Sequence, residues 1–168
     1  MGEIKNLMNE EAIKKLRQLA MDQDIAMFIT KLSYQPSASR PMSTQEVDEE
    51  GNIWFMSRID SNKNRDIQQD SQVQLYYANK SSSEYLSVYG NAEISTDRAK
   101  IEKLWSPIEK AWFTEGKDDP SISLIKITPA EIYYWDTKEN KFISLFKMVM
   151  SAVTGKENHG GIEGKITV

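Results

Sequence analysis

The ten residues WFMSRIDSNK, at positions 54–63, join two kinds of local structure. The first half carries aromatic and apolar residues that favour a strand, whereas Ser61, Asn62 and Lys63 favour the start of a helix with Ser61 as its cap. A helix N-terminus that carries a serine and a lysine presents free backbone N–H groups and positive charge. The stretch therefore predicts an anionic group at the end of this strand.

The surrounding sequence predicts an antiparallel sheet. The turn residues Asp48–Gly51 separate two strands within 39–59, which form a hairpin. Further strands are expected at 24–32, 71–80, 84–95 and 122–137. Gly90 indicates a bulge or a close backbone approach, and Pro129 an edge or a bend. About six hairpin-connected strands with a few helices indicate a mainly β protein, with the sheet closed into a small barrel.

The helices expected from apolar periodicity lie outside these strands. Residues 9–21 form one with Asn9 as its cap, and 61–70 form a short second one. A third over 96–108, capped by Asp97 or Thr96, carries a stripe of apolar residues: Ile101, Leu104, Trp105 and Ile108. Residues 142–155 favour a helix that ends at Gly155, followed by a mobile tail. We expect one domain over 1–168, with a core at about 8–137 and a C-terminal helix and tail at 138–168.

Composition excludes several function classes. The net charge of −4 argues against a nucleic-acid partner. No apolar run approaches the roughly 18 residues of a membrane span, and no signal-peptide core is visible, so a cytoplasmic protein is expected. The chain has no cysteine and one histidine, His159, in a glycine-rich stretch. Thiol chemistry is excluded, zinc and triad sites are disfavoured, and any redox chemistry needs a bound cofactor.

Two groups of polar residues flank the hairpin. Counting back from the turn brings Arg40 toward Ser61 and Lys63, so a guanidinium, an ammonium and a hydroxyl converge on a helix N-terminus. That set suits a phosphate, and the alternative is a surface salt-bridge cluster with a serine cap. The groups are Arg40, Pro41, Met42 and Ser43 before the turn, and Ser57, Ser61 and Lys63 after it.

Aromatic residues form a third group. Trp54 and Phe55 are adjacent on a strand and point to opposite faces, so at least one belongs to the core. Trp105 lies on the apolar stripe and is assigned to the core. Trp112 and Phe113 lie in the polar loop 111–121, where a large apolar pair needs a partner, either a second subunit or a flat ligand ring.

Two further motifs have simpler interpretations. Asp118 and Asp119 precede Pro120, which favours a turn over a pair of metal-binding carboxylates. The segment KENHGGIEGK, at 156–165, has the composition of a phosphate loop but lacks its spaced Gly-Lys-Ser/Thr pattern.

Five stretches occur in an order that resembles a known family. They are RPM (40–42), GNIWFMSRIDSNK (51–63), VYGNAEI (88–94), DRAKIEKLW (97–105) and AWFTEGKDDPSISLIKITPAEIYYWD (111–136). The order is similar to that of the pyridoxamine 5′-phosphate oxidase-like FMN-binding split barrels, and most of all to their bacterial general stress protein subgroup. The resemblance covers about residues 8–137.

The resemblance implies a six-stranded antiparallel split β-barrel that forms a homodimer, with FMN in the interface clefts. It implies that Arg40, Ser61 and Lys63 hold the FMN phosphate. The ring and ribityl chain would be lined by Pro41, Met42, Ser43, Phe55, Met56 and Ser57, and approached from the partner subunit by Trp112 and Phe113. The family often has a further arginine where this chain has Asn62.

The function implied is that of an FMN-dependent oxidoreductase passing electrons from a reduced small-molecule donor, such as a nicotinamide, to an acceptor. A flavin-binding or sequestering stress protein without turnover is the alternative, and a dimeric scaffold with an empty cleft is another. Pyridoxamine-phosphate oxidation is disfavoured, because the family's oxidases use an Arg and His pair near the C-terminus and this chain has no arginine after Arg98.

Overall fold

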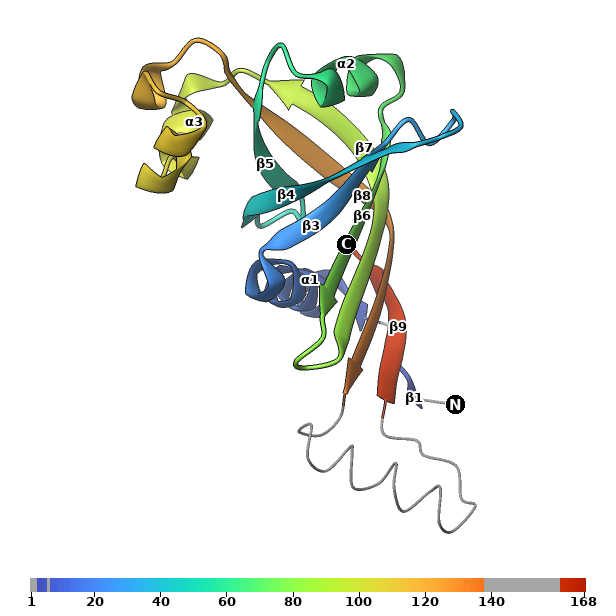
Figure 1. The fold of residues 1–168 in the computed structure, drawn as a ribbon. Coiled ribbons are helices and arrows are strands. Elements are labelled where there is room, and N and C mark those ends of the chain that lie inside the picture. The colour runs from blue at the N-terminus through green and yellow to red at the C-terminus, as the bar shows by residue number, and fades with distance from the viewer. Residues whose placement is uncertain (1–2, 6, 138–160) are drawn as a thin grey trace.

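The structure is a computed structural model that describes residues 3–5, 7–137 and 161–168. Its central strands are β3 (Ile25–Thr30), β4 (Ala38–Val47), β5 (Ile53–Arg58), β6 (Gln72–Asn79), β7 (Glu84–Ser95) and β8 (Ile122–Thr137). They pair in the order β8, β5, β4, β3, β6, β7, and the ring closes because β7 also pairs with β8 (Figure 1). The predicted closed antiparallel barrel of six strands is confirmed.

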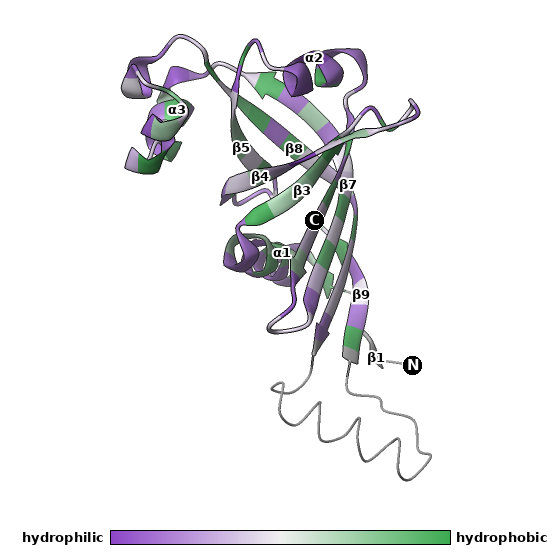
Figure 2. Ribbon diagram, in the orientation of Figure 1, coloured by the Kyte–Doolittle hydropathy of each residue, from purple (hydrophilic) through white to green (hydrophobic). Residues whose placement is uncertain are grey.

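The barrel interior is the main hydrophobic core. Buried and more exposed residues alternate along β6 and β7, so one face of each strand lines the interior. Figure 2 shows hydrophobic residues interspersed with hydrophilic ones along the strands of the barrel. The rings of Phe28 and Phe55 meet there edge to face, with centroids 5.2 Å apart. Leu75, Val88 and Ile125 are fully buried beside them. Fully burying each such side chain contributes roughly 1.5–3 kcal/mol.

The predicted irregularity at Gly90 is confirmed. The register between β7 and β8 shifts between Tyr89 and Gly90, which faces Pro129. A Cβ at Gly90 would lie 2.4 Å from the carbonyl oxygen of Thr128, so only glycine fits this approach. On the other side of β8, pairing with β5 ends at Ile127 and pairing with β9 begins at Ile132. Pro129 therefore lies between these two partner strands, at a local edge where its missing N–H is tolerated.

Helix α1 (Asn9–Gln23) packs against the barrel with one apolar face: Ala12, Leu16, Leu19 and Ala20 are buried. The predicted helix is confirmed, but its predicted cap is wrong. The cap position is Met8, without a side-chain hydrogen bond, and Asn9 itself has φ +55°. The asparagine adopts a left-handed backbone conformation instead of capping.

The hairpin turn and the short helix after it are confirmed. The N–H of Gly51, whose φ is +84°, donates to the carbonyl of Asp48 at 3.2 Å. Helix α2 (Asn62–Gln69) begins at its predicted cap, because the hydroxyl of Ser61 accepts the N–H of Asn64 at 3.3 Å. Helices α1 and α2 lie toward opposite ends of the barrel (Figure 1).

Helix α3 (Arg98–Leu104) is shorter than predicted. The carboxylate of Asp97 caps it, as expected, by accepting the N–H groups of Ala99 and Lys100. The helix stops before Pro107, which opens the separate 3₁₀ helix η1 (Pro107–Ala111), and η2 (Gly116–Asp118) follows. Ile108 is consequently 75% exposed and does not extend the predicted apolar stripe.

The predicted mobile tail is wrong for its last residues. Strand β9 (Gly161–Thr167) pairs antiparallel with β8 and parallel with the short β1 (Glu3–Ile4) and β2 (Leu7–Met8). Ile162 and Ile166 turn toward the core, and Gly164 lets the backbone of Lys5 come close, since a Cβ there would lie 2.0 Å from its carbonyl oxygen. The last strand therefore belongs to the sheet.

The helix expected at 142–155 and His159 lie outside the described residues. Within the described part of the chain, no helix is long and apolar enough to cross a membrane.

Candidate functional site

Serine hydroxyls and an asparagine tie the start of α2 to the barrel. Ser57 on β5 donates to the side-chain oxygen of Asn64 at 2.8 Å, and its hydroxyl lies 3.2 Å from that of Ser61. The amide of Asn64 donates to Ser123 on β8 at 2.9 Å. The structure thus brings the two predicted serines together. Sequence reasoning missed Asn64 and Ser123, whose role depends on contacts across strands.

Arg40 on β4 is held in a fixed position beneath α2. Its Nη1 donates to the hydroxyl of Thr30 at 2.8 Å, and its Nη2 lies 3.5 Å from Oδ2 of Asp66. The Thr30 hydroxyl in turn donates to the same carboxylate oxygen at 2.8 Å. Asp66 is buried on the second turn of α2. The guanidinium is therefore anchored by the same helix that carries Ser61 and Lys63 of the predicted phosphate site.

Lys63, in the first turn of α2, is half-buried and close enough to Arg40 for their charges to repel each other. Burial, and then the positive charge of Arg40, lower the pKa of the Lys63 ammonium. No acidic side chain of the described residues forms an ion pair with it. Two cations near one helix N-terminus create a positive potential, and an anion placed there would relieve their repulsion.

The residues that follow Arg40 divide between the two faces of β4. Arg40 and Met42 stand opposite Phe28 and Ala26, whose side chains are buried inside the barrel. Met42 accordingly packs against the core. Pro41 and Ser43 are exposed on the outer face.

Two of the expected ring contacts are corrected by the structure. The side chain of Phe55 is fully buried against Phe28 in the barrel, which also confirms that one residue of the Trp54–Phe55 pair is core. Met56 is buried in a second cluster, between β5, β8 and α3, with Ile101. The side chains of Phe55 and Met56 point into packed interiors, so only their backbone is available beside a ligand.

Trp112 and Phe113 behave differently from each other. Phe113 is 3% exposed and packs in the second cluster, with its ring centroid 6.4 Å from that of Trp105. The expectation that Phe113 faces a ligand or a partner is therefore wrong, because the turn at the end of η1 directs it into its own chain. Trp112 is 72% exposed, so the prediction that it contacts a second subunit or a ligand ring is compatible with its position.

A buried carboxylic acid lies near this segment and was not foreseen. Glu109 on η1 accepts a hydrogen bond from the side-chain amide of Gln45 at 3.2 Å. Gln45 is the extra residue of a bulge, because Thr44 faces Phe55 and Glu46 already faces Trp54. Burial raises the pKa of the Glu109 carboxyl. The contact joins η1 to the strand that carries Arg40.

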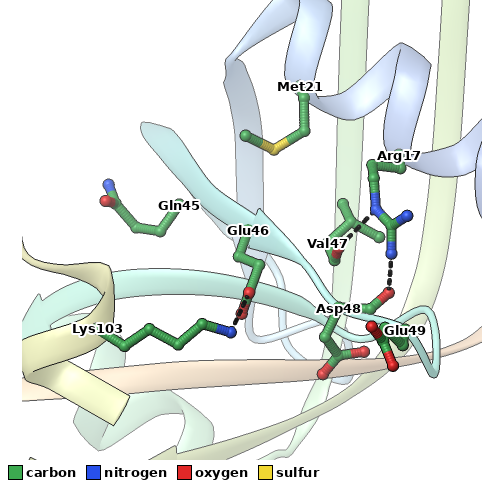
Figure 3. Close-up of a pocket in the computed structure, with 8 residues that line it drawn as sticks. All are labelled: Arg17, Met21, Gln45, Glu46, Val47, Asp48, Glu49 and Lys103. Carbon is green, nitrogen blue, oxygen red and sulfur yellow. Dashed lines mark hydrogen bonds and ion pairs between the residues drawn. The ribbon is translucent and has the colours of Figure 1, made fainter. Parts of the chain in front are cut away.

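A hollow of about 400 Å³ lies elsewhere, between α1, the end of β4 and α3 (Figure 3). In Figure 3 Arg17 reaches the carbonyls of Val47 and Asp48, and Lys103 pairs with Glu46. None of the predicted site residues lines it. Most of its charged groups already have partners, so we assign the candidate site to Arg40 and Lys63 instead.

The acidic pair before Pro120 forms the predicted turn, since Asp119 accepts the N–H of Ser121 at 2.9 Å. No group of three or more histidine and acidic side chains in the described part of the chain is placed to hold a metal ion.

Comparison with known proteins identifies the family. The sequence profile described as "Pyridoxamine 5′-phosphate oxidase like" matches residues 11–159. The chain belongs to this family, as its motifs and barrel had indicated. Protein bli-3 of Neurospora crassa is 26% identical over 127 residues, which are 70% of this chain and 61% of bli-3. The chain therefore matches less than two thirds of that relative.

Solved structures place the chain with the general stress proteins of this family. A structure described as a putative general stress protein 26 from Jannaschia sp. shares the fold, with a TM-score of 0.76, 23% identity and coverage of 94% of this chain and 99% of that one. The general stress FMN/FAD binding protein of Xanthomonas citri is 25% identical, with a TM-score of 0.66 and coverage of 78% and 92%.

Proposed function

We propose that this protein binds FMN and holds its phosphate with Arg40, Lys63 and the start of α2 at Ser61. The observation that carries the proposal is the half-buried Lys63, which lies beside Arg40 and pairs with no acid of the described residues. The name of the Xanthomonas citri relative supports a flavin as the ligand. A phosphate group carries the negative charge that would neutralise these two cations.

The residues present fit such a group. Arg40 offers a planar fork for two phosphate oxygens, and Thr30 and Asp66 hold that fork in place. Lys63 adds a second charge from the first turn of α2. The Ser61 hydroxyl is engaged in capping, so its contribution is to fix the exposed N–H groups of the helix.

The ring and ribityl chain would lie along the outer side of β4. Pro41 and Ser43 offer exposed side chains there, while Met42, Met56 and Ser57 offer backbone groups. Phe55 and Phe113 are not part of this proposed lining, because their side chains are buried in the chain's own cores.

A second copy of the chain would cover this outer face. The register places Pro41 beside Met27, and Met27 beside Tyr76, on three neighbouring strands. Met27 is 44% exposed and Tyr76 is 49% exposed. Pro41, Met27 and Tyr76 thus form a continuous apolar surface, whose exposure to water is unfavourable. Trp112, directly after η1, exposes a large apolar ring. We propose that this ring contacts the outer face and the flavin of the partner subunit.

The chemistry that bound FMN supplies is acceptance of a hydride from a reduced donor, such as a reduced nicotinamide, and onward transfer of the electrons. The protein's own residues bind the phosphate, orient the ring and shield one side of it. We propose an oxidoreductase on this basis.

The test is a visible absorbance spectrum recorded after FMN has been added and the protein desalted. Retention of a flavin spectrum supports the proposal, and a colourless protein contradicts it. Anaerobic addition of NADPH or NADH then tests turnover. Bleaching of the flavin band, reversed by an electron acceptor, supports an oxidoreductase, whereas a retained but unreactive flavin supports binding without turnover by these donors.

A further inference from the structure

A third cation lies at the proposed phosphate site and was not anticipated from the sequence. Lys31 follows the last residue of β3, with a backbone φ of +60°. Its Nζ lies 3.9 Å from Oδ1 of Asp66. The Lys31 side chain is 40% exposed, so it remains at the surface while its charge faces the buried carboxylate.

The two oxygens of Asp66 have different cationic partners. Arg40 and Thr30 contact Oδ2, whereas Lys31 faces Oδ1. Lys63 does not pair with Asp66, and its positive charge is repelled by that of Arg40. Arg40 and Lys31 thus contact the Asp66 carboxylate, and the charge of Lys63 acts on Arg40. Three positive charges and one negative charge leave an excess of about two positive charges. A phosphate monoester at pH 7 carries about 1.5–2 negative charges, which matches that excess.

We propose that Lys31 is a third phosphate ligand of the cofactor site and that it sets the preference for a terminal phosphate monoester over a flavin without phosphate. The inference rests on the proposed binding of FMN. Asp66 and Thr30 fix Arg40, whereas Lys31 has a long and partly exposed side chain. It is free to turn from Asp66 to a bound phosphate without breaking any contact of the barrel core.

A purely structural role for Lys31 makes a different prediction. If Lys31 only pairs with Asp66, its loss alters folding stability but changes the affinities for FMN and riboflavin by the same factor. A phosphate ligand changes the affinity for FMN alone, because the two flavins share the ring and ribityl chain. The ratio of the two affinities is therefore the informative quantity.

The experiment is a fluorescence titration of the wild type with FMN and with riboflavin, repeated on Lys31→Met, Lys31→Arg and Lys80→Met. Lys80 is an exposed lysine in the turn after β6, at the end of that strand away from α2, and serves as a charge-matched control. We expect Lys31→Met to weaken FMN binding about tenfold and to leave riboflavin unchanged. Lys31→Arg and Lys80→Met should keep the wild-type ratio.

Two results separate the failure of this inference from that of the proposed function. If the wild type binds FMN and Lys31→Met binds it equally well, the role of Lys31 is overturned and FMN binding stands. If the wild type binds neither flavin, the proposed function is overturned and the inference falls with it. The difference between wild type and Lys31→Met should also shrink at high salt, since charge interactions at a partly exposed lysine are screened.

Discussion

Nη2 of Arg40 lies 3.5 Å from Oδ2 of Asp66, and this contact connects barrel strand β4 to helix α2. Both side chains are largely withdrawn from water, at 24% and 12% exposure. The carboxylate also accepts the hydroxyl of Thr30. The pair therefore fixes the arginine of the candidate phosphate site before any ligand is present.

Replacing Asp66 with alanine should lower the free energy of unfolding by about 1–3 kcal/mol, because Arg40 and Thr30 lose a shared buried partner. Urea unfolding measures this. Asp60→Ala is the control, since Asp60 pairs with Arg58 in an exposed loop and its loss should change nothing measurable. Equal stability of Asp66→Ala and the wild type would contradict the anchoring role.

The buried Glu109 carboxyl predicts a dependence of stability on pH. Its pKa is raised in the folded state by burial, above the ordinary value of 4.5 that applies when the chain is unfolded. Below that value both states are protonated. As the pH rises, the unfolded state releases its proton first, so the contribution of Glu109 to stability falls until the pH has passed the folded-state pKa.

Glu109→Gln keeps the shape and the contact with Gln45 but cannot ionise. We expect it to be more stable than the wild type at pH 7 and to lose that advantage near pH 4. Thermal unfolding at both pH values measures the difference. Glu115→Gln, on the loop before η2, is a control that should show no such pH-dependent gain. A constant difference between Glu109→Gln and the wild type at both pH values would show that ionisation of Glu109 is not involved.

Trp112→Ala tests the proposed dimer. The side chain is 72% exposed, so its removal should leave the unfolding of the single chain unchanged while raising the dimer dissociation constant. Sedimentation velocity over a range of concentrations measures the latter. Tyr34→Ala removes another exposed aromatic ring, 52% exposed after β3, and should leave assembly unaffected. A Trp112→Ala protein that associates like the wild type would argue against this residue at the interface.

The C-terminal strand can be tested at Gly164. A Cβ added there would lie 2.0 Å from the carbonyl oxygen of Lys5, a backbone atom that cannot move freely. Gly164→Ala should therefore destabilise the protein by about 1–3 kcal/mol in urea unfolding. Gly116→Ala is the contrasting variant, with open space around its Cβ, although its φ of +78° adds local backbone strain. If Gly164→Ala is the more stable of the two, the close approach does not constrain the fold.

Local signals were sufficient to predict the barrel. The turn at Asp48–Gly51, the cap at Ser61 and the irregularity at Gly90 each depend on a residue type whose backbone or hydroxyl chemistry is specific. Strand β9 was missed because its alternation is short and contains glycines, and its partner strands include β1 and β2 at the other end of the sequence. Asn9 was assigned as a cap from composition alone, which cannot show its left-handed backbone.

The candidate site was predictable only in part. Arg40, Ser61 and Lys63 follow from hairpin counting and helix capping. In the structure Ser61 caps α2, Arg40 contacts Asp66 on its second turn, and the charge of Lys63 acts on Arg40. Lys31 and Asp66 could not be found in the same way, since they meet through a loop and a second helical turn. The burial of Phe113 depends on where α3 ends, which apolar periodicity did not reveal.

The central claim is that Arg40 and Lys63 form the phosphate site of a bound FMN. Its most direct test is the FMN dissociation constant of Arg40→Ala/Lys63→Ala, measured against the wild type and against Lys14→Ala/Lys80→Ala, which removes two exposed charges elsewhere. Each charge-assisted contact contributes about 1.5–3 kcal/mol, so the site variant should bind FMN at least about a hundredfold more weakly. The control double variant should bind like the wild type. If the site variant binds FMN with wild-type affinity, the phosphate does not lie between these two residues and the account is contradicted.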